Sequence, residues 1–117
     1  MTYEYINLDY LKLMSADDAD MQKMLLEMMF EEPMAEVKRM REMAAEKDYD
    51  TVHRISHKLK TTFPYIGNEE LTQTNVDLEQ DTKEVPDAAK VRERIDRIEY
   101  LLGQAIPELR QAHAALG

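Results

Sequence analysis

The segment His53–Gly67 reads HRISHKLKTTFPYIG, and the prediction of the whole chain is built outward from it. Counted from the preceding valine, its apolar residues recur at intervals of three and four, the spacing of one helix face. They are Val52, Ile55, Leu59, Phe63 and Ile66. At about 100° of rotation per residue they share one narrow sector, and His57 lies roughly 160° from its middle. The segment therefore predicts a helix with one buried face and an exposed imidazole opposite it.

Basic side chains surround this imidazole, although the protein is acidic. Between His53 and Lys60 the chain holds Arg54 and Lys58 and no carboxylate, within a sequence of formal net charge −9. Lys60 and Thr61 flank the imidazole one turn toward the C-terminus. An exposed imidazole among cations is suited to handling an anion. From the pattern alone, the alternative is an ordinary solvated surface histidine.

The bulk composition excludes several classes of protein. The 117 residues predict one domain spanning 1–117, with a modest core of its own. The absence of cysteine excludes a disulfide framework and a thiolate zinc site. The negative charge opposes binding to nucleic acid, which depends on Lys and Arg. Because no stretch approaches the roughly 18 apolar residues of a membrane span and no signal peptide is evident, we expect a cytoplasmic protein without membrane contact.

Apolar periodicity predicts an all-α fold, an antiparallel four-helix bundle with an additional short N-terminal helix. Asn7 is expected to cap the short helix, and Ser15 with Asp18 resembles a capping box that opens the next one. Pro33 should kink that second helix. Its apolar stripe is interpreted as core, although methionines also line promiscuous binding grooves. The stripe consists of Met21, Met24, Leu25, Met28, Met29, Val37, Met40 and Ala44.

The central helix is predicted to begin at the N-cap Asp48 and to run to Gly67, which suits a left-handed cap. Asn68 can then cap the next helix at once, and residues 81–87 predict a loop. The inward face of that helix holds Leu71, Asn75 and Leu78.

The last helix has the cleanest amphipathic pattern in the chain. Pro107 should bend or end it, and the tail with His113 is expected to fray. The apolar run consists of Val91, Ile95, Ile98, Leu102, Ile106 and Leu109.

One motif resembles a known family. Ser56-His57-Lys58-Leu59-Lys60, followed by Gly67, Leu71 and Leu78-Glu79, resembles the signature of histidine-containing phosphotransfer (HPt) domains. That signature runs His-x-Leu-Lys-Gly, then a glycine a turn or two later, then an apolar helix ending in Leu-Glu or Leu-Gln. The resemblance extends across nearly the whole chain. It implies a phosphorelay intermediate of two-component signalling, a phosphocarrier with no catalytic activity and no cofactor of its own.

The resemblance also implies roles for individual side chains. Nε2 of His57 would be phosphorylated, Lys60 would offset the phosphoryl charge, and Glu79 would accept the Nδ1 proton and orient the ring. A neutral imidazole is a good nucleophile near neutral pH because its unperturbed pKa is about 6.5. The alternatives for Lys60 and Glu79 are an ordinary surface lysine and an ordinary surface carboxylate.

Partner docking is expected beside the histidine, helix against helix, at an apolar patch with a polar rim. The candidate docking residues are Arg54, Lys58, Thr61, Pro64 and Tyr65. Thr61 stands where the family commonly has glycine, so it changes the close approach of a partner, or its hydroxyl binds a phosphoryl oxygen. Pro64 stands where Ser or Ala is usual and should bend the helix just past the active turn.

The implied partners are receiver domains of response regulators, which bring the aspartate and the Mg²⁺, and a sensor or hybrid histidine kinase. We expect the chain to be a monomeric shuttle between them. One alternative is a metal site, because His53 and His57 are four residues apart and Asp50-x-x-His53 echoes a bundle ligand motif. Only one such motif is present, so no metal is expected. The other alternative is an adaptor or antitoxin-like interaction bundle, or a degenerate HPt domain that docks receivers without carrying phosphate.

Overall fold

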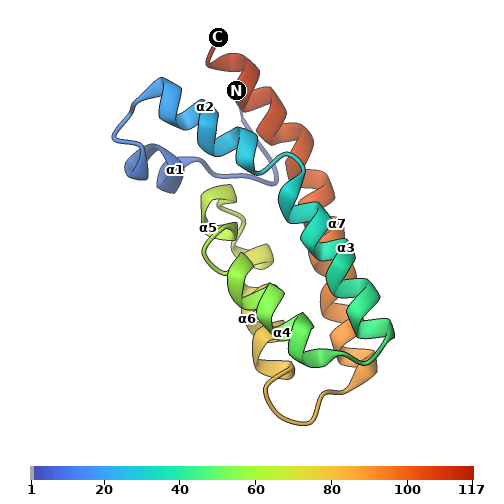
Figure 1. Ribbon diagram of the computed structural model, residues 1–117. Coiled ribbons are helices and arrows are strands. Elements are labelled where there is room, and N and C mark those ends of the chain that lie inside the picture. The colour runs from blue at the N-terminus through green and yellow to red at the C-terminus, as the bar shows by residue number, and fades with distance from the viewer. Residues whose placement is uncertain (1) are drawn as a thin grey trace.

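The computed structural model describes residues 2–117, and over this range the chain is helical with no strand, which confirms the all-α prediction (Figure 1). The helices are α1 (Asp9–Met14), α2 (Ala19–Met28), α3 (Glu32–Ala45), α4 (Tyr49–Leu59), α5 (Phe63–Ile66), α6 (Glu69–Asp81) and α7 (Ala88–Ala115).

The long helices α3, α4, α6 and α7 pack in a closed ring. Helix α3 contacts α4 and α7, and α6 contacts the same two helices from the other side. In Figure 1, α3 and α6 run down the page while α4 and α7 run up, so neighbours in the ring are antiparallel. Helix α7 extends beyond the ring, and α2 packs against this extension, which gives a molecule 46 Å long and 22 by 20 Å across. Within residues 2–117, no helix has the length and apolar character needed to cross a membrane.

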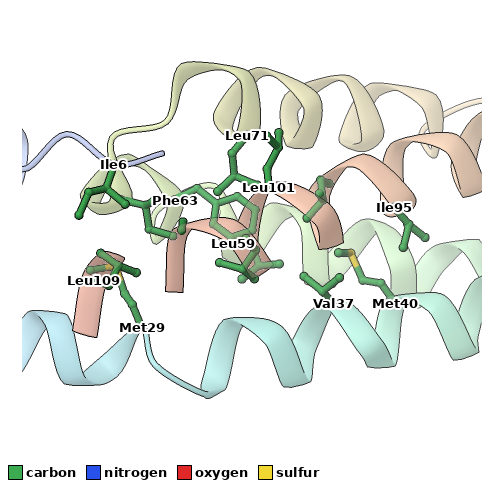
Figure 2. Packing of buried hydrophobic residues seen from close by; sticks show 14 of the residues in the cluster. Ile6, Met29, Val37, Met40, Leu59, Phe63, Leu71, Ile95, Leu101 and Leu109 are labelled. Carbon is green, nitrogen blue, oxygen red and sulfur yellow. The ribbon is translucent and has the colours of Figure 1, made fainter. Parts of the chain in front are cut away.

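The core fills the space between the helices along the whole bundle (Figure 2). Phe63 lies near its middle beside Leu59 and Leu71, and each of the three is at most 2% exposed. Burying a side chain of this size contributes about 1.5–3 kcal/mol relative to leaving it in water. The stripe that the sequence predicts for His53–Gly67 is therefore the face that joins the bundle, and His57 is left on the opposite side.

Four helices, α2, α4, α6 and α7, begin with a side-chain cap. Asp48 accepts from the amide of Thr51 at 3.1 Å and Asn68 from that of Leu71 at 2.9 Å, as predicted. Asp87 caps α7 in the same way. Each cap satisfies an amide that has no partner within the helix.

Two predicted long helices are each divided in two, at the prolines. Pro33 does not kink one helix, because α2 ends at Met28 and Pro33 lies in the first turn of α3. Likewise the central helix does not run to Gly67: α4 ends at Leu59, a turn follows, and Pro64 lies in the first turn of α5. A proline at this position loses nothing, because the first amides of a helix have no intrahelical acceptor.

The predicted capping box is also wrong in detail. The N-cap of α2 is Asp18, which accepts from the amides of Asp20 and Met21, whereas the Ser15 hydroxyl donates back to the carbonyl of Lys12. Asn7 accepts from the amide of Asp9 at 2.9 Å, although the N-cap position of α1 is one residue later.

The C-terminal tail differs from the prediction. Helix α7 continues through Pro107 to Ala115, and its last turns pack, with Leu109 and Ala112 buried. His113 is not frayed, because its Nε2 lies 2.9 Å from a carboxylate oxygen of Glu27 on α2.

The methionine stripe divides between core and surface. Met29 and Met40 are buried as predicted, but Met21, Met24 and Met28 are between 44% and 58% exposed. The interpretation of the whole stripe as core is therefore wrong for the outer half of α2, which presents apolar side chains to solvent.

Candidate functional site

His57 lies in the last turn of α4 with 65% of its side chain exposed, in agreement with the helical wheel. Its Nδ1 is 3.1 Å from Oε1 of Glu79, which comes from α6 and is only 7% exposed. A carboxylate only accepts hydrogen bonds, so Nδ1 carries the ring proton and the lone pair of the neutral ring is on Nε2. The arrangement leaves Nε2 as the nucleophilic atom.

Lys60 shares the same carboxylate. Its Nζ is 3.1 Å from Oε2 and 3.3 Å from Oε1 of Glu79, and the side chain remains 43% exposed. His57 and Lys60, which are three residues apart in the sequence, thus both contact Glu79, the third predicted site residue. The ammonium group stays within reach of solvent beside the imidazole, where it can also meet an incoming anion.

The charge state of Glu79 follows from these contacts. Burial acts to raise the pKa of its carboxyl group, but hydrogen bonds from His57 and Lys60 and the charge of Lys60 act in the opposite direction and outweigh it. The pKa therefore lies below its ordinary value of 4.5, and Glu79 is ionised at neutral pH.

A buried polar pair fixes α4 against α6 beneath the site. Oγ of Ser56 donates to Oδ1 of Asn75 at 2.8 Å, and Nδ2 of Asn75 donates to the carbonyl of Ser56 at 2.9 Å. Both residues are at most 1% exposed. The sequence placed Asn75 on the inward face of its helix, and a polar side chain at such a position was the available signal for this link.

His53 has a role that the sequence did not indicate. Its Nδ1 is 3.2 Å from the carbonyl oxygen of Glu79 and 3.0 Å from Oγ1 of Thr82. Within residues 2–117, no three His, Cys, Asp or Glu side chains form a group that could hold a metal ion. The predicted metal alternative that paired His53 and His57 thus finds no ligand set in the part of the chain that the structure describes.

The candidate docking residues do not all share one surface. Lys58, Thr61 and Tyr65 line a groove of about 360 Å³ between α2, α3 and α4, whereas Pro64 lines a different hollow and Arg54 lines neither. Most of the groove is apolar, with carboxylates at its rim. Its other lining residues are Leu25, Met28, Met29, Glu32, Pro33, Glu36, Leu59 and Thr62.

Several of these side chains already have partners. Nζ of Lys58 lies 3.8 Å from carboxylate oxygens of both Glu32 and Glu36. The hydroxyl of Thr61 donates to the carbonyl of Lys58 at 3.0 Å, so its proton is directed at the backbone. The ring of Tyr65 packs against that of Tyr10 on α1, with centroids 5.1 Å apart. The short N-terminal helix thereby supports one edge of the groove.

Comparison with known proteins identifies the family of the chain. The family model of the Hpt domain matches residues 24–116, so the chain belongs to the Hpt domain family. Hpt domains are phosphocarriers of two-component phosphorelays, and they interact with receiver domains and histidine kinases. No curated protein and no solved structure shows significant similarity to the chain.

Proposed function

We propose that this chain is a phosphorelay intermediate that accepts a phosphoryl group on Nε2 of His57 and exchanges it with the aspartate of a receiver domain. The observation that carries the proposal is the buried carboxylate of Glu79, which holds the Nδ1 proton of an exposed imidazole and leaves the Nε2 lone pair outward. An ordinary surface histidine has no reason to be tied to a 7% exposed carboxylate.

No proton leaves the site during the transfer step. The Nε2 lone pair attacks the phosphorus of the aspartyl phosphate, the P–O bond to the aspartate breaks, and the aspartate leaves as a carboxylate. The product is a phosphorylated imidazolium that keeps its proton on Nδ1. Glu79 stabilises the new positive charge of the ring, and Lys60 approaches the phosphoryl oxygens. The reverse step breaks the P–N bond and returns the neutral imidazole.

For docking, we propose that the receiver occupies the apolar groove beside α4. Met28, which lines the groove, is 57% exposed, and Leu25 and Tyr65 are partly exposed beside it. Interfaces of this kind combine an apolar centre with a polar rim, here Lys58 with Glu32 and Glu36. The predictions of a monomer and of a cytoplasmic location stay predictions.

The test of the phosphoacceptor is transfer from a receiver domain charged with radiolabelled acetyl phosphate in the presence of Mg²⁺. We expect the wild type to take up label that is labile in acid and stable in base, and His57→Gln to take up none. His113→Gln is the matched control, because that imidazole is near Glu27 at the far end of α7 and should not affect labelling. Label that persists in His57→Gln would exclude His57 as the acceptor.

The docking face is tested separately by Met28→Ser and Tyr65→Ala. Loss of one well-placed interface side chain costs about 1–2 kcal/mol, so the receiver concentration at half-maximal transfer rate should rise about five- to thirtyfold. Val85→Ser is the control, because Val85 is 94% exposed in the loop between α6 and α7, at the opposite end of the bundle from α2 (Figure 1). Equal effects of Met28→Ser and Val85→Ser would place docking elsewhere.

A further inference from the structure

The carbonyl of Glu79 lies in the last turn of α6 and lacks its helical donor. In a continuing α-helix it would accept from the amide of Lys83, but that amide instead donates to the carbonyl of Gln80 at 3.1 Å. The carbonyls of a last turn need partners from outside the helix. For Glu79 these partners are Nδ1 of His53 at 3.2 Å and Oγ1 of Thr82 at 3.0 Å.

These contacts fix the tautomer of His53. The carbonyl of Glu79 can only accept, so Nδ1 of His53 must carry a proton. The hydroxyl of Thr82 has one proton, which it directs to the carbonyl of Leu78 or Glu79, and its oxygen accepts from His53 at 3.0 Å. Nδ1 of His53, the hydroxyl of Thr82 and the carbonyl of Glu79 thus form one consistent hydrogen-bond arrangement.

Helix α4 therefore holds Glu79 at two points through two histidines one turn apart. The ring of His57 meets the carboxylate, and the ring of His53 meets the carbonyl of the same residue. Because the carbonyl of Glu79 is held in this way, the last turn of α6 is fixed. The backbone position from which the Glu79 side chain extends is then fixed as well. A shift of that turn by a fraction of an ångström would lengthen the 3.1 Å contact to Nδ1 of His57.

We propose that His53, together with Thr82, is a positioning residue for phosphotransfer, which holds Glu79 so that the carboxylate keeps the reactive tautomer of His57. The inference rests on the proposed function for its kinetic consequence, but its structural consequence concerns the free protein. His53 acts through Glu79 and does not touch the phosphoryl group.

The test compares His53→Phe, which keeps a ring and removes the donor, with His53→Asn, whose side-chain amide places a donor near the position of Nδ1. Nitrogen NMR of the free protein reads the tautomer of His57, and transfer from a phosphorylated receiver gives the maximal rate and the half-saturating receiver concentration. Thr82→Val and Thr82→Ser form the companion pair that removes and keeps the hydroxyl. Helical content and thermal unfolding check that each variant folds.

We expect His53→Phe to lower the maximal transfer rate by about three- to tenfold, the equivalent of one hydrogen bond, with half-saturation unchanged within about twofold. The Nδ1-protonated fraction of His57 should fall in the same variant, and His53→Asn should restore both quantities most of the way. A folded His53→Phe with wild-type tautomer populations overturns the proposal, as does His53→Asn behaving like His53→Phe. If the wild type accepts no phosphate, the proposed function fails, whereas the NMR comparison still decides the role of His53.

Discussion

Gly67 is the residue at which adding a single methyl group should most destabilise the end of the bundle nearest the site. Its φ of 77° is in the left-handed region, and a Cβ placed there would lie 1.9 Å from the carbonyl oxygen of Asn7. The N-terminal segment crosses directly over this turn. The backbone amide of Asn7 donates to the carbonyl of Ile66 at 2.9 Å, and Nδ2 of Asn68 donates to the carbonyl of Tyr5 at 3.0 Å. In Gly67→Ala the segment must move away from the turn, because the overlap is with backbone.

The expected loss can be estimated from these features. A left-handed conformation costs a residue with a Cβ about 1–2 kcal/mol, and each displaced hydrogen bond is worth about 1 kcal/mol net. Gly67→Ala should therefore lower the free energy of unfolding by about 3–4 kcal/mol, a large part of the about 5–15 kcal/mol typical of a domain.

The assay is urea unfolding followed by circular dichroism at neutral pH, with Gly103→Ala as the matched control. Gly103 lies inside α7, and its added Cβ would come no closer than 3.9 Å to Cε of Met34. Alanine is the better helix former, so this variant should gain about 0.5–1 kcal/mol. If the two variants differ by less than about 1 kcal/mol, the close crossing of the N-terminal segment over Gly67 is refuted.

Three further predictions concern the link between α4 and α6. The pKa of the Glu79 carboxyl group is lowered in the folded protein, so the ionised group stabilises the fold above pH 4.5, its ordinary pKa, and this stabilisation is lost as the pH falls below that value. The difference in unfolding free energy between wild type and Glu79→Gln should therefore shrink from pH 7 to pH 3. A difference that stays constant in urea titrations over this range would contradict the prediction. Asn75→Ala should cost about 2–4 kcal/mol, because it removes buried volume and leaves a buried hydroxyl and carbonyl of Ser56 with fewer partners. Ser56→Ala should cost about 1 kcal/mol, and a double-mutant cycle that shows no coupling between positions 56 and 75 would exclude the direct contact.

The fold could be predicted from the sequence as far as periodicity reaches. The apolar stripes gave the helical segments and most of the core, and Asp48 and Asn68 gave two helix starts because their side chains act locally. The prolines could not be interpreted in the same way. Pro33 and Pro64 begin new helices, whereas α7 continues through Pro107, because Leu109 and Ala112 beyond it are buried against the rest of the protein. Tertiary packing decides between these outcomes, and a local pattern does not contain it.

The helical pattern alone indicated His57 and the flanking Lys60, whereas Glu79 and the arrangement of the three residues were expected only through the resemblance. The exposure of His57 follows from the helical wheel, but no spacing rule brings Glu79 to it from another helix. The partners of His53 were not predictable either. Its acceptor is a backbone carbonyl, which leaves no trace in the sequence, and Thr82 follows directly on the last residue of α6, where a threonine is unremarkable as a loop residue.

Ion pairs that remain partly exposed join α3 to α7 and α6 to α7, whereas the Ser56–Asn75 pair that joins α4 to α6 is buried. Apolar ridges alone allow neighbouring helices to slide or rotate slightly at little cost, since one close packing replaces another. The Ser56–Asn75 pair and the contacts from His53 and His57 to Glu79 each require a single relative position of the two helices. A phosphocarrier with an exposed imidazole needs that restriction, because the partner supplies its aspartate from outside and the ring must already point outward in the correct tautomer when the encounter occurs. On the proposed function, the hydrogen bonds between α4 and α6 would therefore hold the His57 ring in this orientation as well as stabilise the bundle.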